Sequence, residues 1–286
     1  MSVAELLARH GQTGALARYL WDPLCISALN TPPETASAQI FLNLFRDALD
    51  GARANSDFLI PRADLGRLFP EPAADFVHAK GGTLRLGTRV RVLENNADGF
   101  VLDAGPERYS HVIVAVGPHQ VDGLLERFPP LEPVRREVAG FDYEPIYTCY
   151  LQYPTGVSLA REMTGFDSGN IQWVFDRGRL NGIPGLLAAV ISAHGAHQDL
   201  SQEELAHGIH GELAASLPGL PAPLWSRVIA EKRATFSCRP GMARPDNRTA
   251  VDRLYLAGDY TASNYPATLE SAIRSGVRAA ELVRGN

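Results

Sequence analysis

The sequence is poor in cysteine and contains no long apolar run. Its three cysteines, Cys25, Cys149 and Cys238, lie far apart, so they suggest neither a disulfide framework nor a metal-binding spacing. A reducing cytosol is the simplest compartment for such a chain. No apolar run reaches the about 18 residues that span a bilayer, and MSVAELLARHGQTG at the start lacks the pattern of a secretory signal. We therefore expect a cytoplasmic protein without a membrane-spanning helix.

Clusters of basic residues are absent as well. The net charge is −5, and the 27 lysines and arginines are scattered along the chain. This argues against a nucleic-acid partner. Hydrophobic residues make up 45% of the 286 residues, enough for a sizeable core. The length is typical of about two domains.

The glycine-rich motifs that bind phosphate groups are also missing from the sequence. A dinucleotide-binding unit needs G-x-G-x-x-G between a strand and a helix, because glycine lets backbone amides approach the pyrophosphate. The glycines at positions 11 and 14, at 81, 82 and 87, and at 117 and 123 have the wrong setting or spacing. No P-loop and no G-x-S-x-G elbow is present, so phosphoryl transfer and serine hydrolysis are not expected.

What the sequence does contain is an alternation of helix and strand patterns. Residues 3–50 predict helices, with Thr31 as the expected cap of the helix that ends before Gly51. Short strands are expected over 83–104, and HVIVAV predicts a buried strand. Longer strands follow (IYTCYLQYP, NIQWVFDRG, GLLAAVISAHG, WSRVIAEKRATFSC), and SQEELAHGIHGELAASLPG predicts a capped helix.

This order predicts an α/β fold of mixed α+β character with two interleaved domains. Residues 71–130 and 241–286 would form an incomplete doubly wound nucleotide-binding domain. Residues 1–70 would form the helical part of a substrate domain, and 131–240 its mixed sheet.

The closing stretch LYLAGDYTASNYPATLESAIRSG predicts a buried strand, a polar turn and a helix. Ligands of α/β sheets lie beyond the carboxyl ends of strands. Gly258 would allow close approach there, and Asp259 would offer a carboxylate to hydroxyl groups. Two starts of the helix are open: Pro266 as first residue, which leaves free N–H groups facing the ligand, or a conventional cap at Thr268. One helix face carries the apolar residues Leu269, Ala272, Ile273, Gly276, Val277 and Ala280.

Aromatic residues and histidines form two further groups. The central strands carry several aromatic residues that would line an apolar cavity or form the sheet core: Tyr143, Tyr147, Tyr150, Tyr153 and Trp173. His194, His197, His207 and His210 lie within seventeen residues, but solvated histidines are favoured and no metal is expected. For Arg62 and Asp22 we favour structural pairing over catalysis.

The segment LYLAGDYTASNYPATLESAIRSGVRAAELV resembles the C-terminal flavin motif of FAD-dependent amine oxidases and phytoene-type desaturases. The resemblance implies that Gly258 and Asp259 lie near the ribityl and pyrophosphate groups of FAD. It also implies that backbone at Ala267, Thr268 and Leu269 meets the pyrimidine edge of the isoalloxazine. GGTLRLGTRVRVL followed by HVIVAVGP resembles a second flavin-domain segment of these families, in which Val90 would meet the adenine.

Several longer stretches are similar to the hydroxysqualene dehydroxylases, also called squalene-associated FAD-dependent desaturases: YLWDPLCISALNTPPETASAQIFLNLFRDAL, SDFLIPRADLGRLFP, FDYEPIYTCYLQYP, QWVFDRG and EKRATFSC. This similarity implies reductive removal of an allylic hydroxyl from an apolar isoprenoid, with transient contact at the inner membrane surface. Tyr143 and Asp142 are then the two acids to test, and Tyr147 and Trp173 are expected to line the substrate cavity.

The family begins with a glycine-rich βαβ unit that this sequence does not show, so FAD loses its strongest anchor in this chain alone. A separate chain that supplies the nucleotide-binding unit is one explanation, and the chain would then be a non-catalytic part by itself. A carotenoid-type desaturase or another flavin amine oxidase is the alternative within the same superfamily.

Overall fold

The computed structural model describes residues 1–167 and 169–285. Helices dominate the first fifty residues: α1 (Val3–Arg9), a π-helical turn η1 (Ala17–Trp21), α2 (Asp22–Leu29) and α3 (Ala38–Leu49). Helix α3 is capped by Ser37, whose side chain accepts from the N–H of Ile40, and not by Thr31 as predicted. Thr31 is buried, and its hydroxyl oxygen accepts from the N–H of Cys238 at 2.9 Å. The hydroxyl of Thr31 therefore binds a residue far away in the sequence, although the local pattern predicted that it caps a helix.

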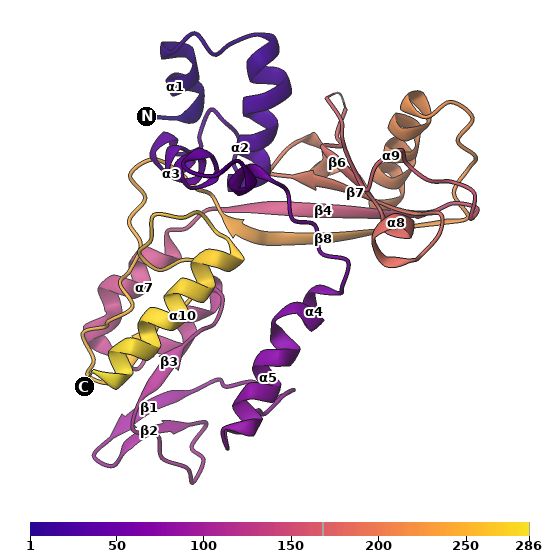
Figure 1. Cartoon of the computed structure of the whole chain (residues 1–286). Coiled ribbons are helices and arrows are strands. Elements are labelled where there is room, and N and C mark those ends of the chain that lie inside the picture. The colour runs from indigo at the N-terminus through magenta and orange to yellow at the C-terminus, as the bar shows by residue number, and fades with distance from the viewer. Residues whose placement is uncertain (168, 286) are drawn as a thin grey trace.

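A five-stranded antiparallel sheet crosses the middle of the molecule (Figure 1). Its strands are β4 (Tyr143–Gln152), β5 (Met163–Gly165), β6 (Trp173–Asp176), β7 (Leu186–Ser192) and β8 (Trp225–Phe236), in the order β5-β6-β7-β4-β8. The short helix α8 (Arg177–Asn181), the turn η4 (Ala196–Asp199) and helix α9 (Gln202–Ser216) join them. Ser201 and Glu204 form the predicted capping box of α9.

A separate set of elements, from residues 93–139 and 254–284, packs around a small parallel sheet. Strands β3 (Val112–Val114) and β9 (Leu254–Leu256) pair in parallel, and β1 (Leu93–Asn96) and β2 (Gly99–Leu102) form a hairpin. The same part of the molecule contains three helices and one turn: α6 (Pro118–Leu125), α7 (Glu132–Ala139), α10 (Leu269–Arg284) and η3 (Pro129–Leu131). Residues 83–87, expected as a strand, have no regular structure.

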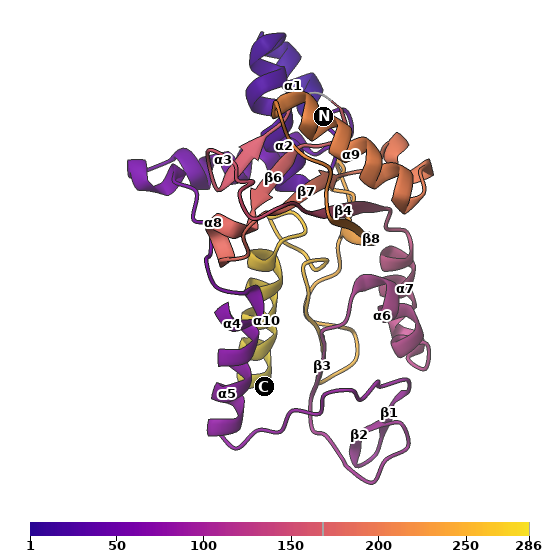
Figure 2. The same ribbon diagram turned by 90° about the vertical axis from the view of Figure 1, so that its right-hand side faces the viewer.

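An arm of short helices extends away from the five-stranded sheet. It contains η2 (Arg53–Ser56), α4 (Leu65–Leu68) and α5 (Pro70–Ala79), and no residue of these three elements is buried. In both views the arm descends on the side of the sheet where α10 lies (Figures 1 and 2). None of the described helices is long and apolar enough to cross a membrane.

Helix α10 buries a different face from its apolar one. The predicted apolar residues do share a face, but Leu269, Ile273 and Val277 are 76%, 40% and 54% exposed. The helix is buried instead through Ser271, Ser275 and Ala279. Glu270 and Arg274 form the expected ion pair four residues apart. Helices α5 and α10 therefore both carry uncovered apolar side chains.

Candidate functional site

The turn that follows β9 requires a glycine at its first position. Gly258 has φ of +150°, and a Cβ on it would lie 2.5 Å from Cε1 of Tyr260. A larger residue would therefore have to displace the Tyr260 ring, which is fully buried beneath the turn. The N–H of Gly258 donates to Oγ of Ser275 at 3.0 Å, which ties the turn to α10.

Ser275 is the centre of a buried hydrogen-bond network. Its hydroxyl contacts Oγ1 of Thr261 at 2.7 Å and accepts from Nδ2 of Asn247 at 2.8 Å. The same amide of Asn247 donates to the carbonyl of Leu256 in β9 at 2.8 Å. Strand, turn and helix are thus held by polar groups that satisfy one another, as a rigid ligand-binding turn requires.

Arg244 holds the rest of the turn from inside. Its Nη1 donates to the carbonyls of Tyr265 at 2.9 Å and Asp259 at 3.3 Å, and its Nη2 donates to the carbonyl of Ser263. Burial lowers the pKa of this guanidinium. The sequence did not point to Arg244, because one arginine in a loop rich in glycine and proline carries no motif.

Asp259 and Tyr143 are both partly buried, and the charge of Asp259 acts on Tyr143. Burial raises the pKa of Asp259, although the N–H of Tyr260 and the guanidinium of Arg244 act in the opposite direction. Burial also raises the pKa of Tyr143, against the lowering effect of Arg233, and the charge of Asp259 adds to the rise. The Arg233 guanidinium lies 5.8 Å from the centre of the Tyr143 ring. Tyr143 and Asp259 therefore lie within electrostatic range of each other.

Helix α10 begins with a conventional cap at Thr268. Its Oγ1 accepts from the N–H of Ser271 at 3.2 Å, which decides between the two starts considered above. Even so, among the described residues no hydrogen-bond acceptor meets the N–H groups of Ala267, Thr268 and Leu269. These three donors are available to a ligand that carries carbonyl oxygens, at the positive end of the helix dipole.

The two faces of the five-stranded sheet differ in burial. Residues directly opposite each other in antiparallel strands share a face. Tyr147 pairs with Ile191, and both are buried against α9, where the Tyr147 ring lies 4.9 Å from that of His197. Tyr147 therefore packs in the core.

The opposite face of the sheet is open. Two cross-strand rows of partly exposed side chains run over it, and we call them the open face: Trp173, Val190, Thr148 and Ile229, then Phe175, Ala188, Tyr150 and Arg227. Ile229 is 53% exposed, and Ala188 is the buried exception. Tyr147 and Trp173 thus lie on opposite faces, because Trp173 pairs with Val190 whereas Tyr147 pairs with the adjacent residue Ile191. Tyr150 lies three residues after Tyr147 in β4, and it is on the open face. The sequence indicated it only as one of several aromatic residues.

The remaining predicted residues lie elsewhere. Asp142 is exposed and forms an ion pair with Arg239 at 2.7 Å. Val90 lies in the irregular segment before β1 and lines a cavity of about 980 Å³ beside Arg85, Glu107 and Tyr109. Arg62 pairs with Glu162 at 3.8 Å, as favoured from the sequence. Asp22 forms no ion pair with another residue that the structure describes, and it lines a cavity where η1 and α2 meet β5 and β6.

The histidines are engaged in separate contacts. Nδ1 of His194 lies 2.7 Å from the buried carboxylate of Glu144, and Nδ1 of His210 lies 3.1 Å from the hydroxyl of Tyr153. His210 is therefore not on the solvated side of α9 as expected. Across the part of the chain that the structure describes, no group of three or more potential ligands could hold a metal ion.

Comparison with known proteins places this geometry in a family. The family model for flavin containing amine oxidoreductases matches residues 2–284. A hydroxysqualene dehydroxylase of Rhodopseudomonas palustris is 32% identical over 95% of this chain. A probable zeta-carotene desaturase of Synechococcus elongatus is 23% identical over 98%. The chain spans 63% and 66% of the length of these two relatives.

Solved structures support the fold. A double mutant of putrescine oxidase superposes with a TM-score of 0.70 at 20% identity, covering 100% of this chain and 68% of that one. The mixed α/β class predicted from the sequence is thereby confirmed. Because the family model covers nearly the whole chain, this chain belongs to the family of flavin-containing amine oxidoreductases.

Proposed function

We propose that this chain forms the ring-binding and substrate-binding part of an FAD-dependent oxidoreductase of isoprenoid metabolism. The proposed reaction is the reductive dehydroxylation of hydroxysqualene to squalene. The observation that carries it is the juxtaposition of the Gly258–Asp259 turn with Tyr143, at one end of β4, whose open face is apolar and aromatic. The relative from Rhodopseudomonas palustris, which carries the name of this activity, supports the choice of substrate.

The residues of the turn fit one half of FAD. Gly258 leaves room for close approach, Asp259 offers acceptors to hydroxyls, and the N–H groups of Ala267, Thr268 and Leu269 suit the carbonyls of a flavin ring. Val90 and its cavity are the proposed site of the adenine. A glycine-rich turn for the pyrophosphate is not among the residues of this sequence.

In the proposed reaction, residues of the chain bind the substrate and donate a proton to it. When bound in its reduced form, FAD supplies a hydride equivalent to the carbon that loses the hydroxyl. The open face binds the hydrocarbon by contact with Tyr150, Phe175 and Ile229 and removes water from the side of the hydrocarbon that it contacts. Tyr143 donates a proton to the departing hydroxyl, so that the carbon–oxygen bond breaks and water leaves. Burial keeps this phenol protonated, since it raises the pKa of Tyr143.

The test is anaerobic turnover in the presence of reduced FAD and a nucleotide-binding segment, with squalene measured by mass spectrometry. Tyr143→Phe is expected to lower kcat by about 10²–10⁴-fold, the usual contribution of a general acid. Asp142→Asn is the matched control, because its exposed carboxylate pairs with Arg239. Equal losses in both variants would contradict the assignment of Tyr143.

The rival activities belong to the same superfamily. A carotenoid-type desaturase would oxidise a polyene and a flavin amine oxidase would oxidise an amine, so turnover of either in place of hydroxysqualene would refute the proposed substrate. Because a C30 isoprenoid resides in bilayers, we also propose transient contact of this chain with a membrane surface.

A second candidate role is that of a part which works only beside a nucleotide-binding segment. The exposed apolar residues of α5 and α10 favour it, since exposed apolar surface on a helix is a candidate interface. Phe76 of α5 is 64% exposed, and Leu269 of α10 is 76% exposed. We propose that a glycine-rich βαβ segment, in the same polypeptide or a separate one, covers this surface.

A further inference from the structure

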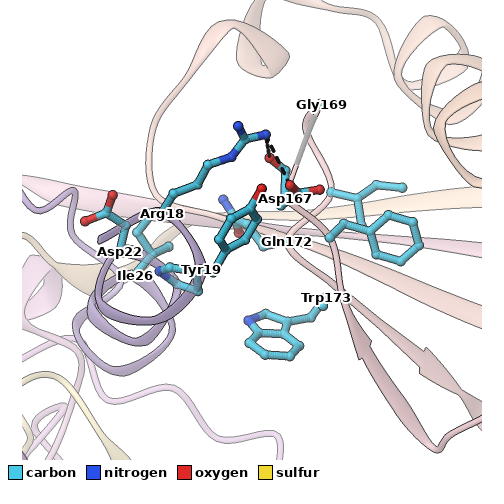
Figure 3. A pocket seen from close by; sticks show the side chains of 12 residues that line it. Arg18, Tyr19, Asp22, Ile26, Asp167, Gly169, Gln172 and Trp173 are labelled. Carbon is cyan, nitrogen blue, oxygen red and sulfur yellow. Dashed lines mark hydrogen bonds and ion pairs between the residues drawn. The ribbon is translucent and has the colours of Figure 1, made fainter. Parts of the chain in front are cut away.

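A cavity of about 460 Å³ lies where η1 and α2 meet the hairpin of β5 and β6 (Figure 3). Ligand-binding cavities in proteins are usually about 300–1,000 Å³ and mainly apolar, and this one satisfies both conditions. The side chains that matter for the argument are Arg18, Tyr19, Ile26, Phe166, Asp167 and Trp173.

The helical wall of the cavity has an irregular backbone. Arg18 and Tyr19 belong to the π-helical turn η1. Such turns are rare and recur at functional sites, since they redirect side chains that a regular α-helix would place elsewhere. Tyr19 is 61% exposed although it is aromatic. In Figure 3 its ring stands above the indole of Trp173, and both border the cavity.

The sheet wall is fixed by Trp173. Its Nε1 donates to Oγ of Ser27 on α2 at 2.7 Å, so the indole bridges the helix and the sheet. Gly165 leaves room for the ring, because a Cβ at Gly165 would lie 3.1 Å from Cζ3 of Trp173. Trp173 also belongs to the open face, through its pairing with Val190. The cavity and the open face therefore share one side chain.

An ion pair joins the two walls at the surface. Nη2 of Arg18 lies 3.1 Å from Oδ2 of Asp167, and both side chains are about half exposed, at 58% and 46%. Figure 3 shows this pair reaching from the helix to the loop between β5 and β6. Exposed pairs of this kind contribute little stability, so the contact opens at small cost.

We propose that this cavity binds the distal hydrocarbon end of the isoprenoid substrate. The inference rests on the proposed function and adds a second subsite to it. The reacting end lies at Tyr143 and the Asp259 turn, the middle of the chain follows the open face, and the far end passes Trp173 into the cavity. The ion pair of Arg18 and Asp167 closes over that end. The cavity thereby selects for chain length, because a short isoprenoid fills the open face alone.

Ile26→Trp tests the inference, since Ile26 lines the cavity and a larger side chain fills it. Binding of squalene and of the C15 hydrocarbon farnesane to the whole chain is measured by equilibrium dialysis from cyclodextrin, which needs no flavin. The expected result is a loss of squalene affinity of roughly tenfold or more, from the carbons no longer buried, with farnesane binding unchanged. Ile183→Trp, at a 44% exposed position away from the cavity, is the matched control.

Trp173→Phe provides a second measurement if Ile26→Trp does not fold. Squalene is expected to quench the fluorescence of the wild-type chain and to lose most of that effect in Trp173→Phe, since Trp21 and Trp225 do not line the cavity. Squalene and farnesane affinities that fall together in Ile26→Trp, or both stay unchanged, would overturn the length-selecting subsite while leaving the proposed function intact. A wild-type chain that binds neither hydrocarbon would overturn the subsite, whereas the turnover assay with the nucleotide-binding segment decides the proposed function separately.

Discussion

At the scale of single residues, Gly258 is the position where the backbone itself limits substitution. Gly258→Ala places a Cβ 2.5 Å from the Tyr260 ring at a φ of +150°. We expect the free energy of unfolding in urea to fall by about 1–3 kcal/mol, the usual cost of such strain. Gly276→Ala is the control, because a Cβ there meets nothing within 4 Å inside α10. It is expected to stabilise by about 0.5–1 kcal/mol. Equal effects of both substitutions would show that the turn is not constrained.

Asp259 predicts a pH dependence of stability. Burial raises its pKa in the folded chain above the unfolded value of 3.8. The folded state therefore binds this proton more tightly, and this contribution to stability falls as the pH rises from the unfolded pKa through the folded one. Asp259→Asn removes the buried charge. The variant is expected to be more stable than the wild type at neutral pH, with a difference that shrinks in acid.

Urea unfolding at a series of pH values measures this difference. Asp252→Asn is the control, since the Asp252 side chain is 80% exposed, and it should change stability by less than about 0.5 kcal/mol at every pH. A variant Asp259→Asn that is less stable than the wild type at neutral pH would show that attraction to Arg244 outweighs burial.

At the scale of elements, the sequence indicated the sheet strands and the cap of α9, because these depend on local patterns. Ser201 and Glu204 are three residues apart, and their reciprocal hydrogen bonds need no distant partner. The role of Thr31 could not be predicted from the local sequence, because its partner Cys238 is 207 positions away. The face of each strand could not be predicted from it either: alternation separates Tyr147 from Trp173 only once the pairing register is known.

In α10 the polar face is buried and the apolar face is exposed, and substitutions on the two faces test this arrangement. Val277→Gln, on the 54% exposed apolar face, is expected to change the free energy of unfolding by less than about 0.5 kcal/mol. Ala279→Gln inserts a polar side chain at a fully buried position and is expected to cost about 2 kcal/mol or more. Chemical denaturation of both variants compares the faces. A larger loss at Val277 would mean that the apolar face is already covered in the isolated chain.

At the scale of the whole molecule, the open face and the exposed surface of α5 and α10 suit different binding partners. The open face of the five-stranded sheet suits an elongated apolar ligand, because it carries aromatic and aliphatic side chains and shares Trp173 with the cavity. The exposed apolar side chains of α5 and α10 lie on two separate helices. In our proposal a folded nucleotide-binding segment covers this surface.

This division predicts how flavin will bind. In our proposal the chain supplies residues for the ring half of FAD only, because its sequence shows no glycine cradle for the pyrophosphate, so the purified chain is expected to be colourless. Co-expression with the part of the Rhodopseudomonas palustris relative that this chain does not match should yield a complex with flavin absorbance near one equivalent. Ile273→Lys combined with Val277→Lys should abolish that capture, because two charges would replace the exposed apolar contacts of α10. Stoichiometric flavin on the chain alone would refute the division, since the turn and helix would then suffice without a second segment.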